Sequence, residues 1–272
     1  MNFIIALLSP NGLKSGVILM VCSILFCKPK LIPPLLDGTT STLVSDQSLP
    51  TGGVDTLTYV MGKFDPAEHP SFSQVPLIYA SRSGMYLRSE ALEAFINMST
   101  AATREGIHLK IISATRNFYA QKNIWEDKWN GRRLVENGQN LAITTPDPIK
   151  RALKILEYSS MPGSSRHHWG TDMDLNALEN AYFSAGEGKK IYDWLVKHGH
   201  EFGFCQPYTA GRLSGYHVEK WHWSYMPVAR PLTDYCLNHL HNEAIQGFDG
   251  AQTASQINIV EDYVLGINQQ CK

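Results

Sequence analysis

The sequence of 272 residues carries little net charge: the formal value is -1, and no Lys/Arg run occurs. Proteins that bind nucleic acid need a basic patch to neutralise phosphates, so we expect no nucleic-acid partner. With 43% hydrophobic and 18% charged residues, the composition is that of an ordinary globular protein. The length suffices for one large domain with extensions.

The sequence also lacks an apolar run of the ~20 residues that a membrane-spanning helix needs. The apolar residues 16–27 form a shorter run between lysines, which is typical of a signal peptide and predicts export to the periplasm or cell envelope. No small-x-small cleavage site follows, and Cys22 and Cys27 lack the preceding small residue of a lipid-attachment site. Cleavage, lipidation and retention as a membrane anchor therefore stay open for residues 1–30, as does a buried N-terminal helix.

Two common metal-site patterns are missing. The five cysteines show no C-x-x-C spacing, which argues against thiolate ligands. His200 and Glu201 are followed by Phe204 where an H-E-x-x-H motif needs histidine, which excludes a zinc peptidase of that helical type. Ten histidines and six tryptophans are present, and several of both lie between residues 165 and 225. We expect the chemistry there.

Composition and periodicity predict the organisation of the chain. Residues 31–58 are rich in Pro, Gly, Ser and Thr and predict a flexible linker, followed by a catalytic domain over 59–230 and a helical extension over 231–272. Alternating apolar residues predict a strand over 107–111, and a second strand is expected over 215–225. Helices and strands do not alternate regularly, so we predict an α+β domain with a small, mainly antiparallel sheet and flanking helices.

A candidate metal site is spread over two stretches. His167 and Asp174 are seven residues apart, with Gly170 between them where the backbone must turn tightly. Downstream, Glu219 and His222 add a second carboxylate and a second imidazole. Two imidazoles and a carboxylate, with one carboxylate to spare, are the inventory of a catalytic zinc centre that leaves its fourth position to water. A structural zinc would need that position closed.

These residues resemble the VanY-type D-alanyl-D-alanine carboxypeptidases, a group related to L,D-carboxypeptidases, lysostaphin-like enzymes and hedgehog domains. The resemblance extends over residues 85–225. It rests on four blocks in the family's order: Ser113-x-x-Arg116, Gln121, Pro162-Gly163-x-Ser165-x-His167-x-x-Gly170-x-x-x-Asp174 and Glu219-x-Trp221-His222. It implies the zinc site of a hedgehog/D-Ala-D-Ala peptidase-like fold.

The resemblance also implies a role for each site residue. The implied roles are zinc ligands for His167, Asp174 and His222, catalytic base for Glu219, substrate-facing cation for Arg116, and substrate contact for Ser165 and Gln121. Arg116 either stabilises the oxyanion or clamps the terminal carboxylate of the substrate, and pairing with a structural acid is the alternative. We expect Trp169, Trp221 and Trp223 to wall the cleft.

Two positions depend on strand geometry. The family usually has a small residue where this chain has Asp172, which alternation places on the same strand face as Asp174. Asp172 is therefore a competing ligand, a group behind the ligands, or a salt-bridge partner of Arg166; we take Asp174 as the ligand. Residues three apart in a strand point to opposite faces, so Glu219 and His222 can share a metal only if Glu219 lies on a bend before the strand.

The implied function is that of an exported, monomeric zinc carboxypeptidase that removes a terminal D-alanine from peptidoglycan stem peptides. D,D and L,D specificity are not distinguished. The alternatives are a peptidoglycan endopeptidase and a non-catalytic zinc-containing module that binds cell-wall peptides. The presence of Glu219 argues against the module, because binding alone needs no base.

Three cysteines lie beyond the N-terminal segment: Cys205, Cys236 and Cys271. An exported domain can oxidise one pair. Apolar spacing after Pro231 places Cys236 on the buried stripe of a helix. We therefore predict a disulfide between Cys205 and Cys271 that pins the C-terminal extension, with Cys236 free.

Overall fold

A computed structural model describes residue 49 and residues 51–272. The signal peptide or anchor predicted for residues 1–30 lies outside the described residues, as does most of the linker predicted for 31–58. The folded chain starts before residue 59, because Thr51 is buried and the first helix already begins at Thr56. Within the described part, none of the helices combines the length and the hydrophobicity that a bilayer crossing requires.

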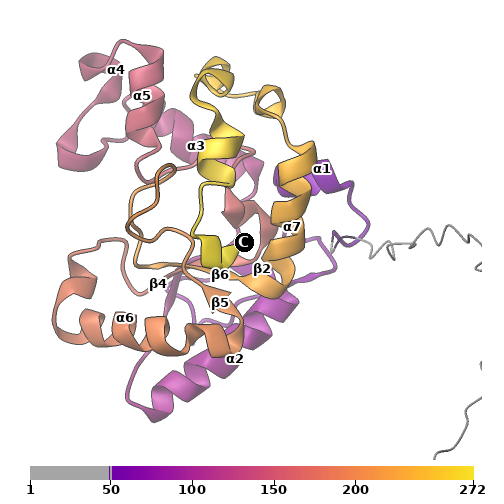
Figure 1. Ribbon diagram of the computed structural model, residues 1–272, viewed down its shortest axis with the longest axis vertical. Helices are drawn as coiled ribbons and strands as arrows, with labels where there is room; N and C mark the ends of the chain where they lie inside the picture. Colours follow the sequence, from indigo (N-terminus) through magenta and orange to yellow (C-terminus); the bar gives the residue numbers. More distant parts are fainter. Residues whose placement is uncertain (1–48, 50) are drawn as a thin grey trace, which may run out of the picture. The chain divides into compact units, whose positions relative to one another are not determined.

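Helices and short strands follow one another along the chain (Figure 1). The α-helices are α1 (Thr56–Val60), α2 (Ser89–Arg104), α3 (Phe118–Trp129), α4 (Leu141–Thr144), α5 (Pro148–Ile155), α6 (Gly186–His198) and α7 (Met226–His239). The strands are β1 (Phe72–Gln74), β2 (Tyr86–Arg88), β3 (Ile111–Ser113), β4 (Asp172–Leu175), β5 (Phe204–Cys205) and β6 (His222–Tyr225). The short η helices are η1 (Glu136–Gly138), η2 (Arg166–Trp169), η3 (Tyr182–Ser184), η4 (Gly199–Phe202), η5 (Asn242–Ala244), η6 (Ala251–Thr253), η7 (Ser255–Ile257), η8 (Ile259–Val264) and η9 (Gln269–Cys271).

The central sheet has four strands in the order β3-β4-β6-β5, and all neighbouring pairs are antiparallel. Strands β1 and β2 form a separate antiparallel pair. The predicted α+β class with a small, mainly antiparallel sheet is confirmed. In the register of β4 and β6, Asp174 lies directly opposite His222 and Met173 opposite Trp223.

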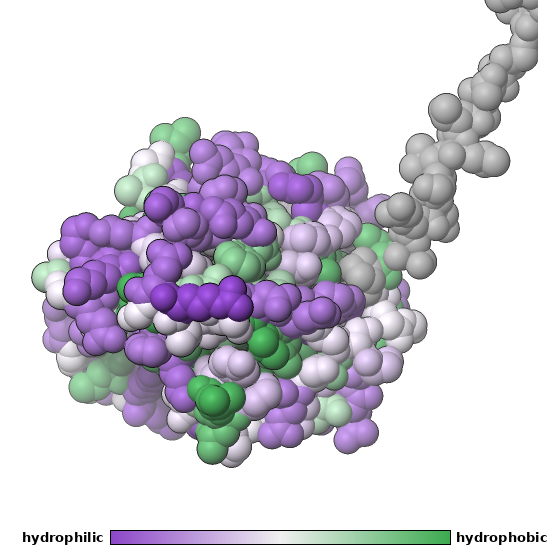
Figure 2. Space-filling model, turned by 90° about the horizontal axis from the view of Figure 1, so that it is seen from below, coloured by the Kyte–Doolittle hydropathy of each residue, from purple (hydrophilic) through white to green (hydrophobic). Residues whose placement is uncertain are grey.

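Alternation along β4 and β6 separates a core face from a polar face. Met173 and Trp223 are buried in a hydrophobic cluster with Phe95 of α2 and Trp194 of α6. Helices α2 and α6 lie together on one side of the sheet (Figure 1). Seen from that side, the surface is mainly hydrophilic with scattered hydrophobic residues (Figure 2). The other face of the sheet is thus left for the polar side chains.

The helix boundaries follow local signals in the sequence. The side chain of Asp147 accepts hydrogen bonds from the backbone N–H groups of Ile149 and Lys150, which caps α5 one residue before Pro148. Helix α2 ends at Arg104, just before Gly106 with its positive φ of 75°.

Both predicted strands begin later in the chain than expected and are shorter. The first is confined to Ile111–Ser113, because the N–H of Ile107 bonds back to Ala102 and completes the end of α2. The second is confined to His222–Tyr225. The chain before it forms a loop, in which the guanidinium of Arg212 donates hydrogen bonds to the carbonyl groups of Ser214, Tyr216 and Gly266.

The C-terminal segment packs against the rest of the domain. Helix α7 runs through the predicted boundary at residues 230 and 231 with Pro231 inside it. Cys205 and Cys271 form the predicted disulfide, with a Cα–Cα distance of 5.7 Å. Cys236 is free and buried, also as predicted. Residues of this segment share a hydrophobic core with α1, α3 and α5.

Candidate metal centre and substrate cavity

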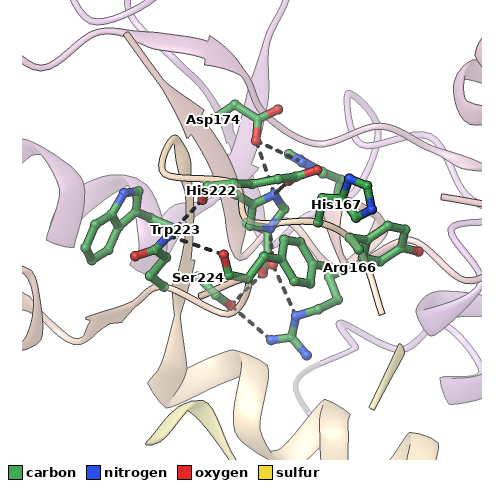
Figure 3. A network of polar contacts seen from close by, with 12 residues as sticks. Arg166, His167, Asp174, His222, Trp223 and Ser224 are labelled. Atoms are coloured by element: carbon green, nitrogen blue, oxygen red, sulfur yellow. Dashed lines mark hydrogen bonds and ion pairs between the residues drawn. The ribbon is translucent and has the colours of Figure 1, made fainter. Parts of the chain in front are cut away.

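The three predicted ligands converge on one point at the polar face of the sheet (Figure 3). His167 lies in η2, and Gly170, with φ 76°, turns the chain from η2 into β4. Asp174 on β4 and His222 on β6 are cross-strand partners. Oδ1 of Asp174 is 3.4 Å from Nε2 of His167 and 3.2 Å from Nδ1 of His222. All three side chains are buried.

The free atoms of this cluster fit a metal ion. Nδ1 of His167 donates to the carbonyl oxygen of Ala114 at 2.9 Å, so its Nε2 keeps a lone pair. Nε2 of His167 and Oδ1 of Asp174 are buried and have no hydrogen-bond partner in the described chain. Leaving such groups unpaired is costly. Two imidazole nitrogens and one carboxylate oxygen are a zinc donor set with a position left open.

Asp172 supports the cluster from behind. Its fully buried carboxylate accepts hydrogen bonds from Arg166 Nε, Thr171 Oγ1, His222 Nε2 and Ser224 Oγ. The bond to His222 spans 2.8 Å and occupies the nitrogen that faces away from Asp174. The sequence left three roles open for Asp172. The structure shows two of them together, because Asp172 both orients the ligand His222 and pairs with Arg166.

The charges of these groups are strongly coupled. Burial opposes the charged form of His222, but its hydrogen bond to Asp172 and the nearby carboxylates of Asp174 and Glu219 raise its pKa well above the usual range. Burial also opposes ionisation of Asp174, but the neighbouring imidazoles of His167 and His222 hold its pKa well below the usual range. Burial lowers the pKa of His167 itself. A cation therefore suits this position.

Glu219 lies on irregular backbone before β6, as predicted. Its Oε2 is 3.4 Å from Nδ1 of His222, and burial raises the pKa of its carboxyl. The peptide groups around it are fixed: its N–H donates to the carbonyl of Tyr208, and its carbonyl accepts from Nε2 of Gln206 at 3.0 Å. Asn180 bonds to the backbone of the neighbouring residues 218 and 220. The carboxylate is thus held at the edge of the metal site.

A cavity of about 600 Å³ opens beside these groups. It is lined by Arg82, Ser113, Arg116, Ile124, Lys128, Arg133, Glu136, Tyr158, Ser159, Ser160, His167, Asp174, Leu178, Glu179, Asn180, Ala181, Tyr208, Tyr216, Glu219, Trp221 and His222. The predicted ligands, the predicted base and Arg116 therefore share one cavity.

Two predicted substrate-contact residues lie behind its wall. Gln121 is fully buried and donates from Nε2 to the carbonyl of Ser160 at 2.7 Å. Ser165 is buried at the start of η2. Neither residue lines the cavity, although Gln121 holds Ser160, which does.

Among the three tryptophans expected to wall the cleft, only Trp221 lines the cavity. Trp169 lies in the core instead, where its Nε1 donates to the carbonyl of Val60. Trp223 lies in the core on the far face of the sheet because it alternates with His222. The expectation was wrong for these two residues.

Other residues of the site carry no signal in the sequence. His168 is bound at both nitrogens, to the carbonyl of Arg116 and the N–H of Gly163, and burial lowers its pKa to about 3. It is therefore a neutral packing residue. Tyr208 and Tyr216 enter the cavity from the loop before Glu219, and only the folding of that loop brings them there.

Comparison with known proteins gives consistent matches. Residues 84–228 match the family model "VanY: D-alanyl-D-alanine carboxypeptidase". "Putative carboxypeptidase YodJ" of Bacillus subtilis is 27% identical over 149 residues, which are 52% of this chain and 46% of that protein. The chain thus spans about half the length of this curated relative.

Solved structures resemble the chain more distantly. The LdcB LD-carboxypeptidase is 20% identical, with a TM-score of 0.46 and coverage of 74% of this chain and 81% of that chain. A vancomycin-resistance D,D-pentapeptidase VanY, solved with Zn(II), is 21% identical, with a TM-score of 0.43 and coverage of 60% and 88%.

Proposed function

The chain belongs to the VanY D-alanyl-D-alanine carboxypeptidase family, and on that premise we propose that it is an exported zinc carboxypeptidase that removes a terminal D-alanine from peptidoglycan stem peptides. One observation carries the proposal: two buried atoms without a hydrogen bond in the described chain, Nε2 of His167 and Oδ1 of Asp174, meet His222 beside the carboxylate of Glu219. A binding module needs the pocket but has no use for such a base.

Zinc held by His167, Asp174 and His222 would supply Lewis acidity, which polarises the scissile carbonyl group and acidifies the attacking water. Glu219 accepts the proton of that water and passes it to the leaving amine. Its raised pKa suits this exchange, because a base works best when its pKa is near the working pH.

Arg116 supplies the positive charge for the substrate. Its side chain lines the cavity, and its Nε is buried without a hydrogen-bond partner in the described chain. The backbone of Arg116 is fixed at both its N–H and its carbonyl. The N–H donates to the carbonyl of His167, and the carbonyl accepts from the ring of His168. A planar guanidinium suits a carboxylate or an oxyanion.

Export is part of the same proposal. The apolar run over residues 16–27 supports it, and the Cys205–Cys271 disulfide is a bond that persists in oxidising compartments. Cell fractionation of the native protein, with the redox state of both cysteines read by mass spectrometry, tests it. Reduced cysteines in a cytosolic fraction would contradict export.

The function is tested by the products. We expect the zinc-loaded protein to release one D-alanine from a pentapeptide or a tetrapeptide stem, read by mass spectrometry. Release from the pentapeptide shows D,D activity, and release from the tetrapeptide shows L,D activity. Internal cleavage would identify an endopeptidase. Peptide binding without any product, despite bound zinc, would identify a binding module and overturn the proposal.

A further inference from the structure

A buried lysine lines the same cavity as the metal ligands. Lys128 lies in the last turn of α3 and is only 7% exposed. Its Nζ donates to Oγ of Ser159 at 2.7 Å. Both residues line the cavity. Among residues 49 and 51–272, no carboxylate forms an ion pair with this amine.

A cation in such a position needs an anion. Burying an ammonium group without a charged partner is costly, because the desolvation is not offset by a nearby opposite charge. Burial accordingly lowers the pKa of Lys128, while Glu136 favours its charged form. The amine also faces the cavity, where a ligand can reach it. These features are those of a binding group for an anion rather than of a packing residue.

Lys128 and the metal site share one cavity. Arg116 stands two residues before the first residue of α3, Phe118, and Lys128 stands at the far end of the helix. Both side chains line the same cavity. The charges of Arg116 and Glu219 also act on the amine of Lys128, so a peptide of a few residues can reach both the metal site and this amine.

We propose that Lys128, together with the hydroxyl of Ser159, binds a second carboxylate of the substrate, on a residue upstream of the scissile bond. The inference rests on the proposed function, since it takes a stem peptide as the ligand. The Ser159 hydroxyl accepts from the amine, so its own proton is free to donate to the carboxylate. Two groups offer this chemistry: the α-carboxylate of a γ-linked D-glutamate and the side-chain carboxylate of diaminopimelate.

Four synthetic pentapeptides separate these sources. They carry D-glutamate or D-isoglutamine at the second position and diaminopimelate or L-lysine at the third. We expect the full-length protein to favour one carboxylate over its neutral counterpart by at least ~10-fold in kcat/KM, the size typical of a charged hydrogen bond. Lys128→Met should bring that ratio near one, and Lys128→Arg should restore it. The peptide pair whose ratio collapses identifies the carboxylate.

Lys150→Met is the matched control. Lys150 is exposed on α5 and does not line the cavity, so this variant should keep the preference. Equal zinc content and melting temperature in all variants would show that the fold is intact. No preference in the wild type, or the same preference in Lys128→Met, would overturn the proposal.

Binding separates this inference from the proposed function. Calorimetry with the same peptides and the Glu219→Gln variant measures the preference in Kd without turnover. A Kd preference that Lys128→Met removes would support the subsite even if no peptide is cleaved. Equal Kd values for all four peptides, or no binding, would overturn it even if D-alanine is released.

Discussion

Asp172 binds the ring nitrogen of His222 that faces away from the metal site, at 2.8 Å. The same carboxylate is paired with Arg166 at 3.2 Å, and both side chains are fully buried. This contact fixes the tautomer of His222 and leaves Nδ1 for the metal, as carboxylates do behind many zinc-bound histidines. One acid, Asp172, thus orients the ligand His222, while a second acid, Asp174, is itself a ligand.

The two aspartates should differ sharply in metal binding. We expect Asp174→Ala to lose most of the zinc, and Asp172→Asn to weaken zinc affinity by ~10–100-fold while still binding it. Asp172→Asn should also lower stability, because it removes the charged partner of buried Arg166. Zinc content by mass spectrometry and affinity by chelator competition measure this, with exposed Asp193→Asn as the control. Zinc retained in Asp174→Ala but lost in Asp172→Asn would reverse the assignment.

Glu219→Gln should separate chemistry from metal binding. The amide cannot accept a proton from water, so we expect kcat to fall by ~10²–10⁴-fold while zinc content and melting temperature stay close to wild type. Glu105→Gln, at an exposed position after α2, is the control for loss of one carboxylate. Turnover close to wild type in Glu219→Gln would exclude this residue as the base.

Arg116→Lys keeps the charge but loses the planar fork. We expect kcat/KM to fall by ~10–100-fold, since one charged hydrogen bond is lost or misplaced. Single-substrate kinetics with the preferred stem peptide measures the effect, and Arg104→Lys at the exposed end of α2 is the control. Unchanged kinetics would leave Arg116 with a structural role only.

The disulfide and the free thiol make separate predictions. Cys205→Ser with Cys271→Ser should lower the free energy of unfolding by about 4 kcal/mol in the chain-entropy model, for a sequence separation of 66 residues.

Burial raises the pKa of Cys236 to about 12, so it should resist alkylation at pH 8 until the protein unfolds. Denaturation curves and peptide mapping after iodoacetamide measure these effects. Rapid native labelling of Cys236 would contradict its burial.

Much of the metal site follows from short-range sequence rules. Alternation in a strand demanded that Glu219 leave the strand before His222, and the backbone does so. Alternation could not choose between Asp172 and Asp174, since both lie on one face. The choice depends on which end of the strand meets His167, and only the packing of η2 on β4 decides that.

Other features depend on contacts between distant segments. Lys128 sits in a polar stretch without apolar periodicity, so nothing local predicts that its amine is buried against Ser159. The side chain of Gln121 is directed by helix α3 into the protein, where it bonds to Ser160, and local sequence does not predict this contact. The fold class could be predicted because the order of helices and strands determines it. The residues that wall the cavity could not be predicted, because many of them lie on loops whose folding depends on distant contacts.

The disulfide also sets an order in which the site is completed as the protein is made. His167, Asp174, Glu219 and His222 all leave the ribosome before Cys271, whose bond to Cys205 is adjacent to Gln206, the residue that holds the carbonyl of Glu219. In a reducing compartment the metal ligands can come together before the disulfide next to Gln206 forms. We therefore expect a newly made chain to bring its metal ligands together first and to fix the peptide group of Glu219 only after oxidation.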